Sequence, residues 1–160
     1  MGNKLKVGWF TFTCCEDSTI IFTELMNTHW QEWREKLEFV HAKTLQSKNE
    51  LREMDVAFVE GAISSPVQEE KLKKIRALSK KLVAIGACAC TGLPATQRNT
   101  FDGPIKEEIN DLLIRFNHAP RVRTVADVVP VDAKVHGCPM TEQQFMIVLN
   151  KYLVEFGITQ

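Results

Sequence analysis

The sequence lacks both a long hydrophobic run and an excess of charge of either sign. No apolar stretch approaches the roughly 20 residues that a membrane-spanning helix needs. The 20 basic and 20 acidic residues leave a formal net charge of zero. A neutral chain has no electrostatic footprint for nucleic acid or for an anionic membrane surface. We therefore expect no nucleic acid partner and no membrane span.

Three sequence patterns are also missing. The opening MGNKLKVGWFTF passes directly into a strand pattern and does not have the segments of a secretory leader. The paired C-x₂₋₄-C knuckles of structural zinc sites are absent, and no Ser-, Thr- or Gly-rich turn for a flavin phosphate follows the first strand. We expect a cytoplasmic protein, in which cysteines bind metals or react more often than they form disulfides.

The chain of 160 residues is long enough to bury a core without disulfides, and we expect one domain over 1–160. Short apolar runs predict strands, and apolar residues at helical spacing predict helices between them. The expected strands are Lys4–Phe12, Leu37–Thr44, Val56–Glu60, Leu82–Ile85 and, as a strand or an extended segment, Val125–Val131. Helices are expected from Thr19 with Ser18 as cap, from Pro66 to about Lys80 with Ser65 as cap, over Ile105–Phe116, and from the cap Thr141 to Phe156. Thr91–Pro104 has no periodicity and is expected to be a loop.

Strands that alternate with helices predict an α/β protein with a mostly parallel sheet covered on both faces. The five cysteines fall in three places, each just beyond a predicted strand: Cys14 with Cys15, Cys88 with Cys90, and Cys138. In an open α/β sheet such turns gather along one edge, where ligands and cofactors bind. Thiolates that converge there are soft ligands, suited to an iron–sulfur cluster or to zinc.

Other readings of these cysteines stay open on the residues alone. A buried cysteine is commonly a small hydrophobic residue, and a tandem pair can form a vicinal disulfide or a redox dithiol. Adjacent residues of a regular strand point to opposite faces, so Cys14 and Cys15 can share a cofactor only where the backbone is irregular. The glycines near the three places let the backbone approach a cofactor closely.

Four segments carry a family resemblance over nearly the whole chain: KVGWFTFTCCEDS, DVAFVEGAISSPVQEEKLKKIR, KKLVAIGACACTGLPATQRN and VVPVDAKVHGCPMTEQQF. Their order and spacing resemble the small subunit of nickel–iron hydrogenases, above all the short delta-type subunits of cytosolic group 3 enzymes, and the related 20 kDa subunit of respiratory complex I. The resemblance implies a flavodoxin-like three-layer fold with one 4Fe–4S cluster, of the proximal type, at the carboxyl edge of the sheet.

The resemblance also implies the ligands of that cluster. Cys88 and Cys138 match ligand positions directly, and Cys15 matches the first cysteine of the hydrogenase C-x-x-C motif, whose second cysteine is Ser18 here. Cys14 is the expected substitute, because complex I-type subunits have a tandem Cys-Cys pair in this loop, and Cys90 is expected to be a non-ligand. The ligand set implied is therefore Cys14, Cys15, Cys88 and Cys138.

Two further residues near these loops have alternative readings. Glu60 falls at the VEG motif beside the cluster loops, as a carboxylate bonded to backbone N–H groups or as a proton-handling or cluster-orienting group. His136 lies close to Cys138 in sequence and either tunes the cluster by a hydrogen bond or is an ordinary surface histidine.

The function implied is that of an electron-transfer subunit of an oxidoreductase. Its partners would be a large subunit with the nickel–iron site, which this chain lacks, and an NAD(P)-, iron–sulfur- or flavin-containing electron-transfer subunit. One alternative is a complex I-like subunit that passes electrons to a quinone or another acceptor. From other classes, a flavodoxin-like module that binds flavin or zinc and a thiol oxidoreductase that uses Cys14 and Cys15 also remain.

Overall fold

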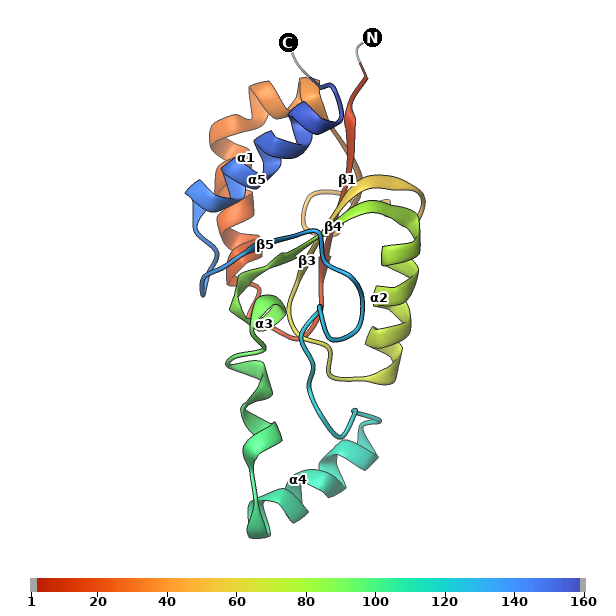
Figure 1. The fold of residues 1–160 in the computed structure, drawn as a ribbon, viewed down its shortest axis with the longest axis vertical. Helices are drawn as coiled ribbons and strands as arrows, with labels where there is room; N and C mark the ends of the chain where they lie inside the picture. Colours follow the sequence, from red (N-terminus) through yellow and green to blue (C-terminus); the bar gives the residue numbers. More distant parts are fainter. Residues whose placement is uncertain (1–2, 159–160) are drawn as a thin grey trace.

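The computed structural model describes residues 3–158, which form a five-stranded sheet surrounded by helices (Figure 1). The strands are β1 (Leu5–Thr11), β2 (Leu37–Ala42), β3 (Met54–Glu60), β4 (Ser79–Ile85) and β5 (Ala133–Val135). The helices are α1 (Asp17–Lys36), α2 (Pro66–Leu78), α3 (Gly86–Cys90), the 3₁₀ helix η1 (Ala95–Thr100), α4 (Gly103–Arg115) and α5 (Glu142–Glu155). Within the described part of the chain, no helix is both long enough and apolar enough to span a bilayer.

The strands lie in the order β2-β1-β3-β4-β5, and all four neighbouring pairs are parallel. This order is that of flavodoxin-like folds, in which the chain winds first one way and then the other from β1. The α/β fold with a mostly parallel sheet is therefore confirmed. The switch of direction places a crevice at the carboxyl ends of β1 and β3.

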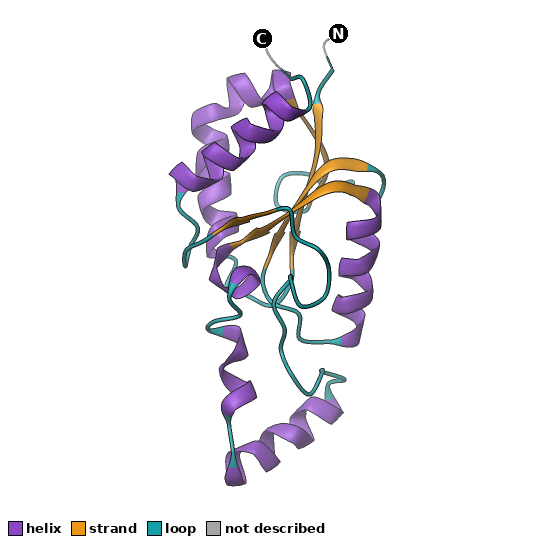
Figure 2. Cartoon of the chain, viewed as in Figure 1, coloured by secondary structure: helices purple, strands orange, loops and turns teal. Residues whose placement is uncertain are grey.

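Helices cover both faces of the sheet, with α1 and α5 on one face and α2 on the other (Figure 2). Successive side chains of a strand point to opposite faces of the sheet, so alternate residues of each strand pack into one core or the other. On β1, Trp9 packs toward α1, where its ring stacks on Phe22 with centroids 4.2 Å apart, and Phe10 packs on the α2 side. The strands are therefore buried on both faces, which explains their nearly continuous apolar sequence.

Two predicted helix starts differ in detail from the structure. The helix α1 begins at Asp17, so that Ser18 lies inside its first turn and is not the cap. Ser65 does cap α2, since its side chain accepts a hydrogen bond from the backbone N–H of Gln68 at 3.3 Å. Thr141 occupies the cap position of α5 but forms no side-chain cap bond.

Residues 91–121 form an arm that projects from the body beyond the carboxyl edge of the sheet (Figure 1). The segment Thr91–Pro104, predicted to be a loop, contains η1. The predicted helix over Ile105–Phe116 is present as α4, yet none of its residues is buried. Leu112 is 45% exposed and Ile114 is 80% exposed, so these apolar side chains of α4 have no covering layer within the described residues.

The prediction for the last strand was wrong. Val125–Val131 is neither a strand nor an extended segment, because residues 126–128 form a turn, although Val125 and Val129 are buried in the core on the α2 side. The fifth strand, β5, follows at Ala133–Val135 and pairs with β4. The three residues of β5 are too few to show the apolar run or the alternation that predicts a strand.

Candidate functional site

A recess opens at the carboxyl edge of the sheet, at the crevice between β1 and β3. It has an empty volume of about 240 Å³ and is formed by the turns that follow β1, β4 and β5, together with the end of β3. The residues that line it are Cys14, Cys15, Asp17, Ser18, Glu60, Ile85, Gly86, Ala87, Cys88, Gly137, Cys138 and Pro139. We call it the cysteine recess, because it brings together four cysteines from segments that are far apart in the chain.

The tandem pair shares this recess because the backbone after β1 is irregular. Thr13 forms an isolated antiparallel bridge with Ala62, and its N–H donates to the Ala62 carbonyl at 3.0 Å. Glu16 then adopts a left-handed conformation with φ of 65° before α1 begins. The regular alternation of a strand therefore ends before Cys14, and both thiols line the same space.

Two glycines allow the other cysteine turns to approach closely. Gly86, at the end of β4, has φ of +79°, and a Cβ there would lie 3.0 Å from the Ser18 hydroxyl. Gly137 has φ of +121°, and a Cβ there would lie 2.4 Å from the Pro139 carbonyl oxygen. The N–H of Ala87 donates to the Gly137 carbonyl at 2.7 Å and ties these two turns together.

Cys90, in contrast, does not line the cysteine recess. Its Sγ lies 3.4 Å from the Ala84 carbonyl oxygen and 3.6 Å from that of Val135, within the core on the α2 side. Burial raises the pKa of this thiol to about 11. Cys90 therefore behaves as a small core residue with a weak S–H donor.

Ser18 connects the first cysteine turn to the last. Its side chain is buried, and its Oγ accepts a hydrogen bond from the N–H of Met140 at 3.1 Å, two residues beyond Cys138. The side chain thus fixes the start of α1 against the turn that carries Cys138. His136 is exposed and is not among the residues that line the recess.

Glu60 anchors the first turn of α1 from the neighbouring strand. Its carboxylate is 3% exposed and accepts hydrogen bonds from the N–H of Ser18 at 3.0 Å and from the hydroxyl of Thr19 at 2.6 Å. The indole N–H of Trp9 donates to the same Thr19 oxygen at 2.8 Å. Burial raises the pKa of Glu60 against these hydrogen bonds, which favour its ionised form. The carboxylate therefore satisfies the Ser18 N–H, which in the first turn of α1 has no intrahelical partner.

Burial also keeps two of the recess thiols protonated. It raises the pKa of Cys14 to about 12, with a further rise from the Glu60 charge, and it raises the pKa of Cys88. Metal binding deprotonates such ligands and releases their protons. Among residues 3–158, no three His, Cys, Asp or Glu side chains converge closely enough to bind one metal ion.

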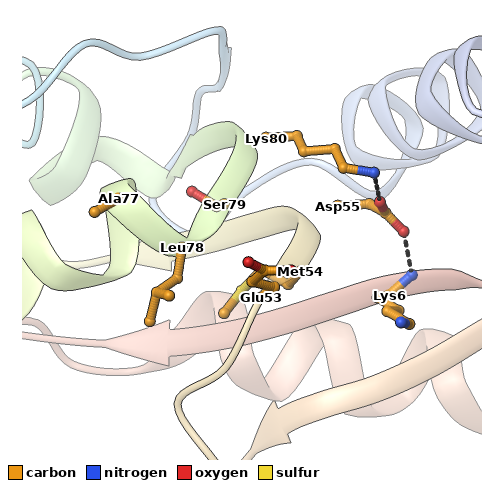
Figure 3. A pocket seen from close by; sticks show the side chains of 8 residues that line it. All are labelled: Lys6, Glu53, Met54, Asp55, Ala77, Leu78, Ser79 and Lys80. Atoms are coloured by element: carbon orange, nitrogen blue, oxygen red, sulfur yellow. Dashed lines mark hydrogen bonds and ion pairs between the residues drawn. The ribbon is translucent and has the colours of Figure 1, made fainter.

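A wider recess lies at the opposite, amino edge of the sheet (Figure 3). There the carboxylate of Asp55 accepts hydrogen bonds from the Lys6 N–H at 2.9 Å and from the Lys80 ammonium at 2.7 Å. No cysteine or histidine lines this recess, and its central carboxylate is already paired. Its residues join β1, β3 and β4, and we assign them to stability.

Comparison with known proteins places this geometry in a family. The delta subunit of sulfhydrogenase 2 from Pyrococcus furiosus is 31% identical over 156 residues, which cover 91% of this chain and 60% of that protein. The gamma subunit of coenzyme F420 hydrogenase from Methanosarcina barkeri is 28% identical over 141 residues, or 87% of this chain and 50% of that protein. The chain thus spans between half and two thirds of the length of these two relatives.

The fold has close counterparts among solved structures. A chain in the crystal structure of an NAD⁺-reducing [NiFe]-hydrogenase in the H₂-reduced state superposes with a TM-score of 0.83. It covers 96% of this chain and 93% of the other, and at 22% identity it shows a shared fold. The model of the family described as NADH ubiquinone oxidoreductase, 20 Kd subunit, matches residues 14–152, which include all the cysteines. The chain belongs to this 20 kDa subunit family, which the sequence resemblance predicted.

Proposed function

We propose that the protein is the electron-transfer small subunit of a nickel–iron hydrogenase and that it holds one 4Fe–4S cluster in the cysteine recess. The observation that carries this proposal is the meeting of four cysteines, from three distant turns, at the crevice where the sheet changes direction. We assign the cluster ligands to Cys14, Cys15, Cys88 and Cys138.

The donor set of the recess fits this cofactor. Four thiolates are the usual ligands of a 4Fe–4S cluster, and they are distributed over four irons instead of one ion. When bound, the cluster supplies a site that accepts and releases one electron at a time. Structural zinc sites usually take two C-x₂₋₄-C knuckles, which the sequence lacks, and this disfavours the zinc-binding alternative.

The surrounding residues prepare the recess for its occupant. Gly86 and Gly137 allow the Cys88 and Cys138 turns to approach, because side chains at these positions would meet neighbouring atoms. Ser18 holds the Cys138 turn against α1. Glu60 fixes the first turn of α1, and we assign it a positioning role, since its oxygens already accept two hydrogen bonds.

The partner in this proposal is a large subunit that carries the nickel–iron site, with a further electron-transfer subunit. The relatives support this, because they are named as subunits of hydrogenases. Cys15 and Cys138 are exposed at the rim of the recess, and α4 presents uncovered apolar residues beyond the same edge. Exposed apolar surface of this kind marks a protein–protein contact. We place this assembly in the cytoplasm, in keeping with five free cysteines.

A complex I-like subunit that delivers electrons to a quinone is the second candidate. The tandem Cys14–Cys15 pair favours it, since the pair matches the complex I-type loop and both thiols line the recess. Purification of the assembly through a tag on this chain separates the two candidates. Nickel in the copurified large subunit supports the hydrogenase, and a large subunit without nickel supports the relative.

The cluster is tested by anaerobic purification of the full chain, followed by absorption spectra and by iron and sulfide analysis. We expect a brown protein with about four irons and four sulfides per chain. Ser variants of Cys14 and Cys88 should lose most of the iron, whereas the matched control Cys90→Ser should keep it. A colourless protein with one zinc, a yellow protein with flavin, or loss of iron in Cys90→Ser alone would overturn the assignment.

A further inference from the structure

A second recess at the carboxyl edge lies beside the ends of β1 and β2, and it is rich in basic groups. Five of its residues are Thr11, His41, Lys43, Thr44 and Lys71, and we call it the basic recess. These residues come from β1, from β2 and the loop that follows it, and from α2. No aspartate or glutamate lines the recess. The two recesses share no lining residue, although Thr19, which also lines the basic recess, donates a hydrogen bond to Glu60 of the cysteine recess.

Its two lysines lack a counter-charge. Neither Lys43 nor Lys71 forms an ion pair with a carboxylate of residues 3–158. Lys71 is half-buried, and its ammonium lies 5.6 Å from the centroid of the Phe12 ring, which holds it at the recess. Burial and the charge of Lys43 both lower the pKa of Lys71. The two ammonium groups repel one another, and an anion bound between them would offset this repulsion.

His41 is a third basic group in this recess. His41 is 8% exposed and its ring stacks on Phe10. Its Nδ1 lies 3.0 Å from the Trp9 carbonyl oxygen, which can only accept, so Nδ1 carries the proton and donates. Burial and the charges of Lys71 and Lys43 lower the pKa of His41. An anion in the recess would therefore favour the protonated imidazole as well.

We propose that the basic recess binds a phosphate group through the ammonium groups of Lys43 and Lys71. Lysine recognises phosphate as a compact point charge, and the hydroxyls of Thr11 and Thr44 are suitable neutral donors. The recess is small, which suits a single phosphate group better than a large ligand. The ligand is accordingly inorganic phosphate or the phosphate of a small ester.

Calorimetric titration of the anaerobically purified full chain tests this proposal. Inorganic phosphate and ribose 5-phosphate are added separately at constant ionic strength, with chloride as the reference anion. We expect saturable binding with one site per chain, and we expect Lys43→Met to weaken it about tenfold or more, as loss of one charge-assisted hydrogen bond does. Tighter binding of the ester indicates a phosphate-bearing metabolite, and equal or weaker binding indicates the free ion.

Two controls keep the outcome interpretable. Lys74→Met alters an exposed lysine on the same helix as Lys71 and should leave binding unchanged. Lys43 is exposed, so its variant should melt at the parent temperature without phosphate. A phosphate-dependent rise in the pKa of His41, followed by NMR, gives a second readout that is independent of iron content. The proposal is overturned if the parent chain does not saturate, or if Lys74→Met weakens binding as much as Lys43→Met.

Discussion

The sharpest test of how the fold supports the site is removal of the Glu60 carboxylate. This buried group accepts the N–H of Ser18 and the hydroxyl of Thr19, and both donors are buried in the first turn of α1. Glu60→Ala leaves the two donors without an acceptor in a place that water does not reach freely. Glu60→Gln keeps the side-chain volume and one acceptor oxygen. It also removes the charge of a carboxyl group whose pKa is raised by burial.

The magnitude follows from the number of donors left unpaired. A buried donor without a partner costs about 1–3 kcal/mol, so Glu60→Ala should destabilise the protein by about 2–6 kcal/mol. For a chain of this size each kcal/mol lowers Tm by about 2–4 °C, which predicts a fall of about 5–20 °C. Glu60→Gln leaves at most one donor unpaired and relieves the buried charge, so its effect should be less than half as large.

Thermal melting of the anaerobic protein at one fixed scan rate measures this effect, with iron content determined for each variant. Glu70→Ala is the matched control, because Glu70 is exposed on α2 and its replacement should change Tm very little. The reasoning fails if Glu60→Ala melts together with Glu70→Ala, or if Glu60→Gln is as damaging as Glu60→Ala.

Three further predictions follow from the same structure. Gly86→Ala should lower both iron content and Tm, because the new Cβ would lie 3.0 Å from the Ser18 hydroxyl. Gly157→Ala is the control: Gly157 has a similar φ of +70° but open space around it, so the variant should lose only about 1–2 kcal/mol of stability through backbone strain and keep its iron. The pKa of His41 is lowered from 6.5 in the folded state, so the unfolded chain binds more protons and the free energy of unfolding should fall as pH drops through and below 6.5. Chemical denaturation of His41→Gln should show a flatter dependence of this free energy on pH, and an unchanged dependence would contradict the prediction. Ile114→Lys on α4 should leave Tm within about 2 °C of the parent yet weaken copurification of the large subunit, and equal weakening by the exposed control Ile147→Lys on α5 would rule out a specific role for α4.

The central sheet could be predicted because its strands carry a strong local signal. Strands buried on both faces read as continuous apolar runs, and the helices between them show apolar residues at helical spacing. The apolar residues of Val125–Val131 led to a wrong strand prediction, because Val125 and Val129 are apolar for another reason. They fill the core beside α2 from an irregular segment, and β5 begins only at Ala133.

The position of α4 could not be predicted from its sequence pattern. Apolar residues at helical spacing show that a helix has a side to bury, but they do not say whether this chain or another protein covers it. In the described residues of this structure no layer covers Leu112 or Ile114. The same pattern in α5 predicted burial correctly, since Phe145 and Leu149 pack against the sheet.

Strand ends predicted that the three cysteine turns would meet, and the structure brings them together in one recess. The sequence left open whether Cys14, Ser18 or Cys90 completes the set of four ligands. The answer depends on contacts that local patterns do not encode: the Ser18 hydroxyl is engaged by the N–H of Met140, 122 residues further along the chain, and the Cys90 thiol faces backbone carbonyls in the core. Cys14 faces the recess only because the backbone leaves the strand before it. The fourth ligand is therefore a consequence of tertiary structure, and we propose Cys14 on that ground.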